Sequence, residues 1–113
     1  ETLTSGRVGW ADLSVVQGTR ILRSDYALSL EVAEHIPPQY EANYLDNLDL
    51  SNMRGLVLSW SRWGPKQSGH GHVNPKSPEQ VKALFKRRGY RYDANATLVL
   101  RKCASFPYLR TGI

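Results

Sequence analysis

The sequence is poor in cysteine and has no long apolar run. Among its 113 residues only Cys103 is a cysteine, so neither an internal disulfide nor a cysteine-based metal cluster can form. We interpret Cys103 as a small, half-buried hydrophobic residue. No apolar run approaches the roughly 20 residues that span a bilayer, and no basic-then-apolar signal pattern opens the chain. We therefore expect no membrane partner and a cytoplasmic protein; the Asn95-Ala96-Thr97 glycosylation triplet would matter only on a secretory route.

Internal repeats, low-complexity segments and room for a second core are also lacking. Apolar residues make up 41% of the chain and charged residues 22%, as in ordinary globular proteins. Residues 1–113 therefore predict one packed domain. The sequence opens on Glu1 rather than Met, from which we expect that an upstream part was removed and that this domain is partial.

The charge is unbalanced, at +5, which would suit an anionic partner. Five basic residues lie close together in the sequence: Lys82, Lys86, Arg87, Arg88 and Arg91. No aromatic residues alternate with them as a base-stacking surface requires. We interpret the cluster as a solvated helix face and do not expect a nucleic-acid partner.

Apolar runs and turn signals alternate in a strand, helix, strand, helix order, which is typical of a mostly parallel sheet with flanking helices. The expected strands are Val8–Leu13, ending near Asp12, a central Tyr26–Leu30, and Gly55–Trp60. Pro37 and Pro38 open a helix between the last two strands. Its apolar stripe consists of Tyr40, Tyr44, Leu45 and Leu48. The fold class is therefore α/β.

The second half contains a long Gly- and Pro-rich stretch, 61–76, of the kind that is usually functional. Ser77–Gln80 then predicts a capped helix start, with Val81, Leu84 and Phe85 buried. Gly89 ends this helix in the left-handed conformation. Tyr90–Asp93 is a short strand candidate, and residues 97–103 suit a strand or a helix equally well.

Three segments carry a resemblance to a known family. They read ADLS at 11–14, LSLEVAEHIP at 28–37, and GLVLSW at 55–60 followed by GHGHVN at 69–74. Together they resemble the class I S-adenosylmethionine-dependent methyltransferases, over about Val8 to Tyr108. The resemblance implies a partial Rossmann-like sheet that begins at the family's third strand. It also favours a helix over 97–103.

The resemblance also shows what is missing. The family's first strand with its glycine-rich turn, and the second strand with its ribose-binding acid, have no counterpart here. Gly69–Gly71 has only the start of a glycine-rich loop and does not lead into a helix. We therefore expect a methyltransferase fragment that is inactive alone and binds S-adenosylmethionine poorly, the full-length protein methylating an acceptor that the sequence does not identify.

Cofactor contacts are expected from Asp12, Leu13 and Glu31. By the resemblance, Asp12 would accept a hydrogen bond from the adenine amino group and Leu13 would flank the ring. The alternative for Asp12 is a turn-capping role. Glu31 follows the central strand, at the sheet edge where the methyl donor would lie.

Catalytic roles are expected from Glu34 and His35, which follow Glu31 at the same edge. His35 has a suitable ordinary pKa for a proton acceptor, and Glu34 could orient it or bind the acceptor. The alternative is a solvated helix-entry cluster. His70, His72 and Asn74 are expected to line the acceptor site, whereas a zinc site is not predicted because two histidines without a nearby carboxylate are insufficient.

A second function class stays open. Without the first two strands, one edge of a hydrophobic parallel sheet would be exposed, and exposed edges pair with other chains. The chain could then be a non-catalytic interaction module that forms a homo-oligomer or binds a different chain through that edge.

Overall fold

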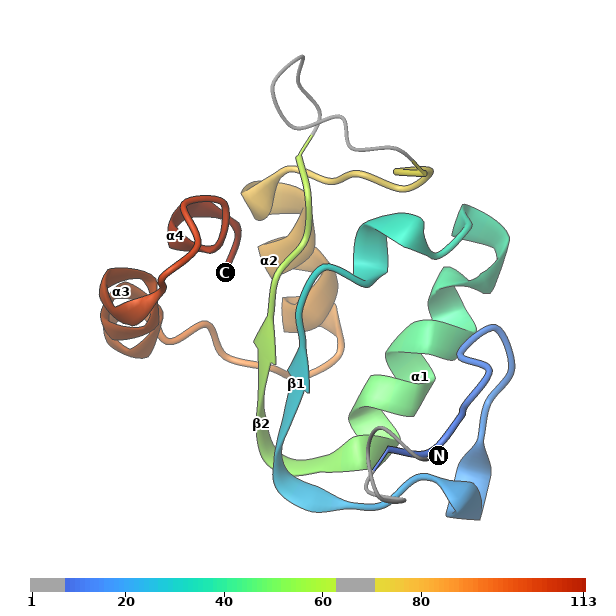
Figure 1. The fold of residues 1–113 in the computed structure, drawn as a ribbon. Helices are drawn as coiled ribbons and strands as arrows, with labels where there is room; N and C mark the ends of the chain where they lie inside the picture. Colours follow the sequence, from blue (N-terminus) through green and yellow to red (C-terminus); the bar gives the residue numbers. More distant parts are fainter. Residues whose placement is uncertain (1–7, 63–70) are drawn as a thin grey trace.

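The computed structural model describes residues 8–62 and 71–113. The elements run in the order η1 (Gly18–Arg20), β1 (Ser24–Ser29), η2 (Ala33–His35), η3 (Pro38–Tyr40), α1 (Glu41–Ser51), β2 (Asn52–Leu58), α2 (Pro78–Arg87), α3 (Ala94–Cys103) and α4 (Leu109–Gly112), where η marks a short 3-10 helix. In Figure 1, α1 lies on one side of the strand pair, and α3 and α4 lie on the other. No helix in the described ranges has the length and apolar character needed to cross a membrane.

The strand–helix–strand unit β1–α1–β2 confirms the predicted α/β class. β1 and β2 pair in parallel, with Tyr26 opposite Gly55 and Ser29 opposite Leu58. Because parallel neighbours need a crossover, α1 carries the chain back along the sheet. The strand predicted to be central corresponds to β1. Among the described residues β1 is not central, because β2 is its only hydrogen-bonded neighbour. The structure thus shows a small parallel sheet with flanking helices.

The core lies between α1, the carboxyl ends of the strands and α2. Its buried hydrophobic residues are Ala33, Tyr44, Leu45, Leu48, Trp60 and Phe85. Tyr44, Leu45 and Leu48 are three of the four stripe residues predicted from the spacing, whereas Tyr40 remains exposed. Burying each large apolar side chain contributes about 2 kcal/mol, so this stripe fixes α1 against the strands.

Local end signals determine the two longest C-terminal helices. The Ser77 hydroxyl accepts the Gln80 N–H while the Gln80 side chain accepts the Ser77 N–H, which is the predicted capping box. Gly89 has φ +90°, as predicted for a residue that ends a helix. The Asp93 carboxylate caps α3 by accepting the Ala96 N–H. Residues 97–103 are therefore helical, as the resemblance implied.

Two predicted strands are wrong. Val8–Leu13 forms no strand, because the Asp12 carboxylate accepts the Ser14 N–H and turns the chain. Tyr90–Asp93 is also irregular: the Tyr90 N–H is bonded to Phe85 O at the end of α2, and the segment pairs with neither of the strands that the structure describes. Cys103 is exposed on α3 rather than half-buried.

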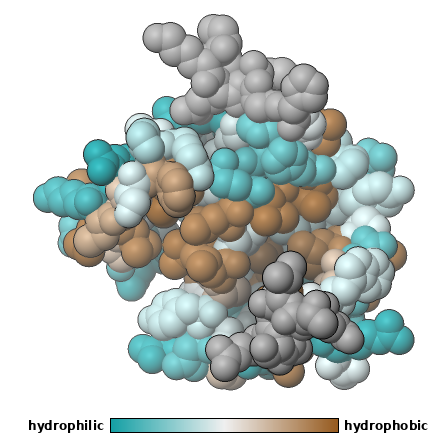
Figure 2. Space-filling view, viewed as in Figure 1, coloured by the Kyte–Doolittle hydropathy of each residue, from teal (hydrophilic) through white to brown (hydrophobic). Residues whose placement is uncertain are grey.

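Part of the strand pair is uncovered. Leu28 on β1 is 69% exposed and Met53 on β2 is 57% exposed. Figure 2 shows hydrophobic atoms gathered across the centre of this face. An open groove of about 1250 Å³ lies beside β2, lined by residues of α2, α3 and α4 as well. The described residues thus leave apolar sheet surface without a covering layer.

Candidate functional site at the carboxyl edge of the sheet

The site begins where β1 ends. Glu31 has φ +56°, the only positive φ of a non-glycine residue in the described ranges. This left-handed residue turns the chain out of the strand and into η2, where the His35 N–H bonds to Val32 O at 3.0 Å. The turn places Glu31, Glu34 and His35 at the carboxyl edge of the sheet, as the sequence predicted.

The end of β2 holds this turn in place. The Ser59 hydroxyl accepts the Glu31 N–H at 2.7 Å and donates to Glu31 Oε1 at 2.7 Å. Ser59 is fully buried. Sequence analysis did not single out Ser59, although its place at the end of a parallel neighbour strand was a usable signal.

The loop after β2 returns to η2 and brings His72 to Glu34 and His35. The N–H groups of Val73 and Asn74 donate to the backbone oxygen of Glu34 at 2.9 and 3.0 Å. The His35 and His72 rings meet edge to face with centroids 4.8 Å apart. One potential ligand atom from each of Glu34, His35 and His72 lies within 4.8 Å of the other two. We call these three residues the Glu–His–His cluster.

The carboxylate of this cluster is out of reach of solvent. Glu34 is 0% exposed, and neither of its carboxylate oxygens has a hydrogen-bond partner within residues 8–62 and 71–113. This burial raises the pKa of Glu34 above its usual range. His72 Nδ1 is likewise buried, with no partner in the described part of the chain. His35 is exposed, and its Nδ1 lies 3.0 Å from Gly71 O.

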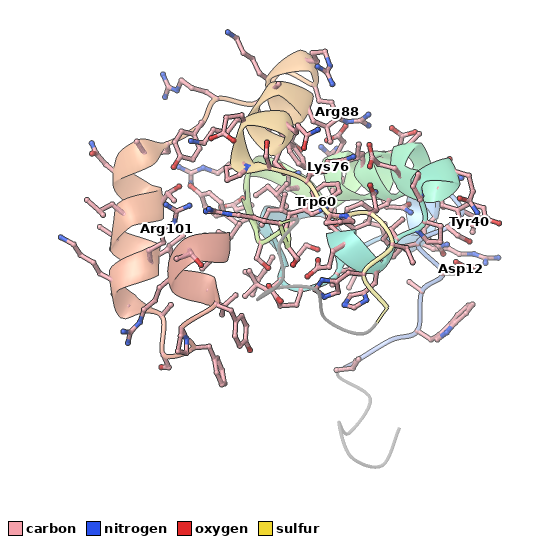
Figure 3. All side chains as sticks on the ribbon, turned by 90° about the horizontal axis from the view of Figure 1, so that it is seen from above. Asp12, Tyr40, Trp60, Lys76, Arg88 and Arg101 are labelled. Atoms are coloured by element: carbon pink, nitrogen blue, oxygen red, sulfur yellow. The ribbon has the colours of Figure 1, made fainter. Side chains whose placement is uncertain are left out.

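Asn74 supports the loop from beneath. Its buried amide donates to Glu41 Oε2 at 2.6 Å, and its backbone oxygen accepts the Trp60 indole N–H at 2.7 Å. Lys76 pairs with the same Glu41 oxygen at 2.8 Å and lies over the Trp60 ring, 5.3 Å from the centroid. Trp60 and Lys76 lie together at the centre of Figure 3. Asn74 thus has a supporting position.

Asp12 and Leu13 are held away from this edge. The Asp12 carboxylate is bonded to the Ser14 N–H and hydroxyl, and the hydroxyl bond lowers the pKa of Asp12. Leu13 packs against the core, and its backbone oxygen accepts from Asn47 on α1 at 3.4 Å. In Figure 3 Asp12 lies near the rim, well apart from Trp60. The geometry matches the turn role considered as the alternative for Asp12.

The structure therefore gathers Glu31, Glu34, His35 and His72 at one edge, with Asn74 just below. The predicted acceptor residue His70 lies outside the described residues. A zinc site was not predicted because no carboxylate or third ligand was expected near the histidines. This expectation is wrong, because Glu34 and His35 lie beside His72. The carboxyl ends of successive parallel strands lie close together, and this rule could have predicted that the residues after β1 and after β2 meet.

Comparisons with known proteins add no relative. The chain matches no protein-family profile, no curated protein and no solved structure.

Proposed function

We propose that this chain is the acceptor-side part of a class I S-adenosylmethionine-dependent methyltransferase domain. One observation carries the proposal: the β1–α1–β2 crossover sets Glu31, Glu34 and His35 at the carboxyl ends of parallel strands. Ligands of open α/β sheets bind at that edge. The motifs in 28–37 and 55–60 that resemble the family span the ends of these strands and the residues that follow them.

His35 has the position expected for a proton acceptor. Its side chain is exposed, and the contact of its Nδ1 with Gly71 O fixes the ring. Nε2 is then left to take a proton from the methyl-acceptor substrate. Glu34 lies beside both imidazoles. His72 would form one wall of the acceptor pocket. Asn74, bonded to Glu41 and Trp60, would hold that wall in place.

The cofactor needs more than the described residues offer. Asp12 is engaged with Ser14, and Leu13 packs into the core. We therefore assign the nucleotide cradle to another polypeptide segment, which would pair with the edge of β1 that no described strand occupies. A further layer over the sheet face is also expected, because Leu28 and Met53 are exposed and apolar sheet faces are normally covered.

The second candidate function is a non-catalytic module that pairs with a second copy of itself. The uncovered strand face and the groove beside β2 favour it. Light scattering at micromolar concentrations separates the candidates. A concentration-dependent dimer that Leu28→Lys abolishes supports self-pairing, whereas a monomer at every concentration contradicts it.

Calorimetric titration with S-adenosylmethionine tests the enzyme proposal. We expect no binding heat from this chain alone, and binding once a glycine-rich class I half precedes it in one polypeptide. In that longer protein, His35→Ala should lower methyl transfer about 100-fold with little change in cofactor affinity. Tight binding by this chain alone would contradict the missing cradle, and no binding by the longer protein would contradict the methyltransferase proposal.

A further inference from the structure

We propose that the Glu–His–His cluster is a binding site for a divalent transition metal ion, with zinc as the best match. Glu34, His35 and His72 would each supply one ligand, and a fourth position would stay open. This inference does not rest on the methyltransferase proposal, and it assigns His35 Nε2 to the ion in place of the proton-acceptor role.

The donor set is one that zinc uses. Two imidazoles and one carboxylate, with an open fourth position, form a common arrangement of catalytic zinc sites. The three ligand atoms lie within 4.8 Å of one another. In a tetrahedral site with ordinary zinc bond lengths they would lie about 3.4 Å apart. The required approach is of the order of 1 Å, which rotation of the exposed His35 side chain can supply.

Burial supplies an independent argument. The Glu34 carboxylate is fully buried, and neither of its oxygens has a hydrogen-bond partner among the residues that the structure describes. Buried carboxylates are normally paired, hydrogen-bonded or bound to a metal. His72 Nδ1 is also buried and has no partner in the same ranges, so a cation between Glu34 and His72 would satisfy both groups together.

The surroundings of His35 match the outer shell of a metal site. Histidine ligands usually donate their second ring N–H to a carboxylate or a backbone carbonyl. His35 Nδ1 lies 3.0 Å from Gly71 O, so this bond leaves Nε2 for the ion. Gly71 has φ +83°, a conformation that other residues rarely adopt. The same loop turn therefore positions the Gly71 carbonyl and delivers His72.

A proton is the competing occupant. A proton bound by the Glu34 carboxyl group would remove its charge without any metal. Calorimetric titration of the chain with ZnCl₂ distinguishes the two. The metal site predicts one zinc per chain, and Co²⁺ added in its place should give the intense visible absorption of four-coordinate cobalt.

Single substitutions locate the ion. Loss of an outer-shell partner weakens metal binding 10–100-fold, so Glu34→Gln, His35→Ala and His72→Ala should each weaken zinc binding by about 100-fold or more. Glu79→Gln is the matched control, since Glu79 is exposed on α2 and its loss should leave zinc affinity unchanged. Circular dichroism in EDTA checks that every variant is folded.

Two results would overturn the proposal. One is the absence of zinc binding by the folded wild-type chain. The other is zinc binding that survives Glu34→Gln and His35→Ala, because the ion would then lie elsewhere. Since S-adenosylmethionine is absent from these titrations, neither result bears on the methyltransferase proposal.

Discussion

The Ser59 hydroxyl joins the ends of both strands by two hydrogen bonds to Glu31. It accepts the Glu31 N–H and donates to the Glu31 carboxylate, each over 2.7 Å. Glu31 has a positive φ, which a side-chain-bearing residue keeps only when its surroundings hold it there. Ser59 thus maintains the turn that leads to Glu34 and His35.

Ser59→Ala should lower the free energy of unfolding by about 1–3 kcal/mol, because the Glu31 N–H loses its partner. Urea denaturation followed by circular dichroism measures this. Ser105→Ala is the control, since Ser105 is exposed and such surface changes stay within about 0.5 kcal/mol. Equal stability of the two variants would show that the turn does not need Ser59.

Tyr44 should make the protein sensitive to alkali. Burial raises the pKa of Tyr44 from 10.0 to about 12. Because the folded-state pKa is the higher one, the stabilisation is present below pH 10 and is lost as the pH rises from 10 to 12, by about 2 kcal/mol.

Tyr44→Phe removes this titration. The variant should be about 1 kcal/mol less stable than wild type at neutral pH, since its bond to the Ser29 hydroxyl is lost. Its stability should fall less steeply above pH 10. Urea titrations from pH 9 to 12, about one unit below to two units above the ordinary tyrosine pKa, measure this. If the free energy of unfolding falls equally steeply with pH in both proteins, the prediction is contradicted.

Arg88 should hold α2 to α1. Its guanidinium donates to Asp49 Oδ2 at 2.8 Å and also pairs with Asp46. Arg88→Ala should lower the free energy of unfolding by about 1 kcal/mol. Arg88→Lys should recover little of this loss, because an ammonium group lacks the planar guanidinium geometry that pairs with both carboxylates. Arg87→Ala, in the exposed neighbour, is the control for thermal melting. If both alanine variants have the same melting temperature, the ion pairs of Arg88 contribute nothing measurable to stability.

Glu34→Gln should stabilise the metal-free protein. A buried carboxylate without a donor is costly, whereas the amide of the same shape carries no charge. In EDTA the variant should gain about 1 kcal/mol of unfolding free energy, and saturating zinc should reverse the order. A less stable variant in EDTA would show that the charge already has a compensating partner.

The predictions that held depended on short-range signals. The capping box at Ser77 and the left-handed Gly89 are set by residues within one helical turn, so the sequence specifies them directly. The stripe of Tyr44, Leu45 and Leu48 likewise follows from helical spacing. The βαβ order followed from the alternation of these elements.

The failures concerned a missing neighbour strand and contacts distant in sequence. Val8–Leu13 and Tyr90–Asp93 contain apolar residues suited to strands, but a strand also needs a neighbour, and none is present among the described residues. The cluster was missed for a related reason: His35 and Gly71 are 36 positions apart, and only the packed loop brings His72 to Glu34. Asp12 was expected at the end of a strand; because no strand forms at 8–13, Asp12 lies in a turn instead.

The indole of Trp60 is nearly fully buried, and its N–H is bonded to the loop residue Asn74. Asn74 in turn donates its backbone N–H to Glu34, so two hydrogen bonds connect the fluorophore with the cluster. Tryptophan emission responds to the polarity around the ring, and replacing the other two tryptophans, Trp10 and Trp63, with Phe would isolate the Trp60 signal. The protein thus carries an intrinsic optical sensor with which ligand arrival can be timed by stopped flow, without any attached dye.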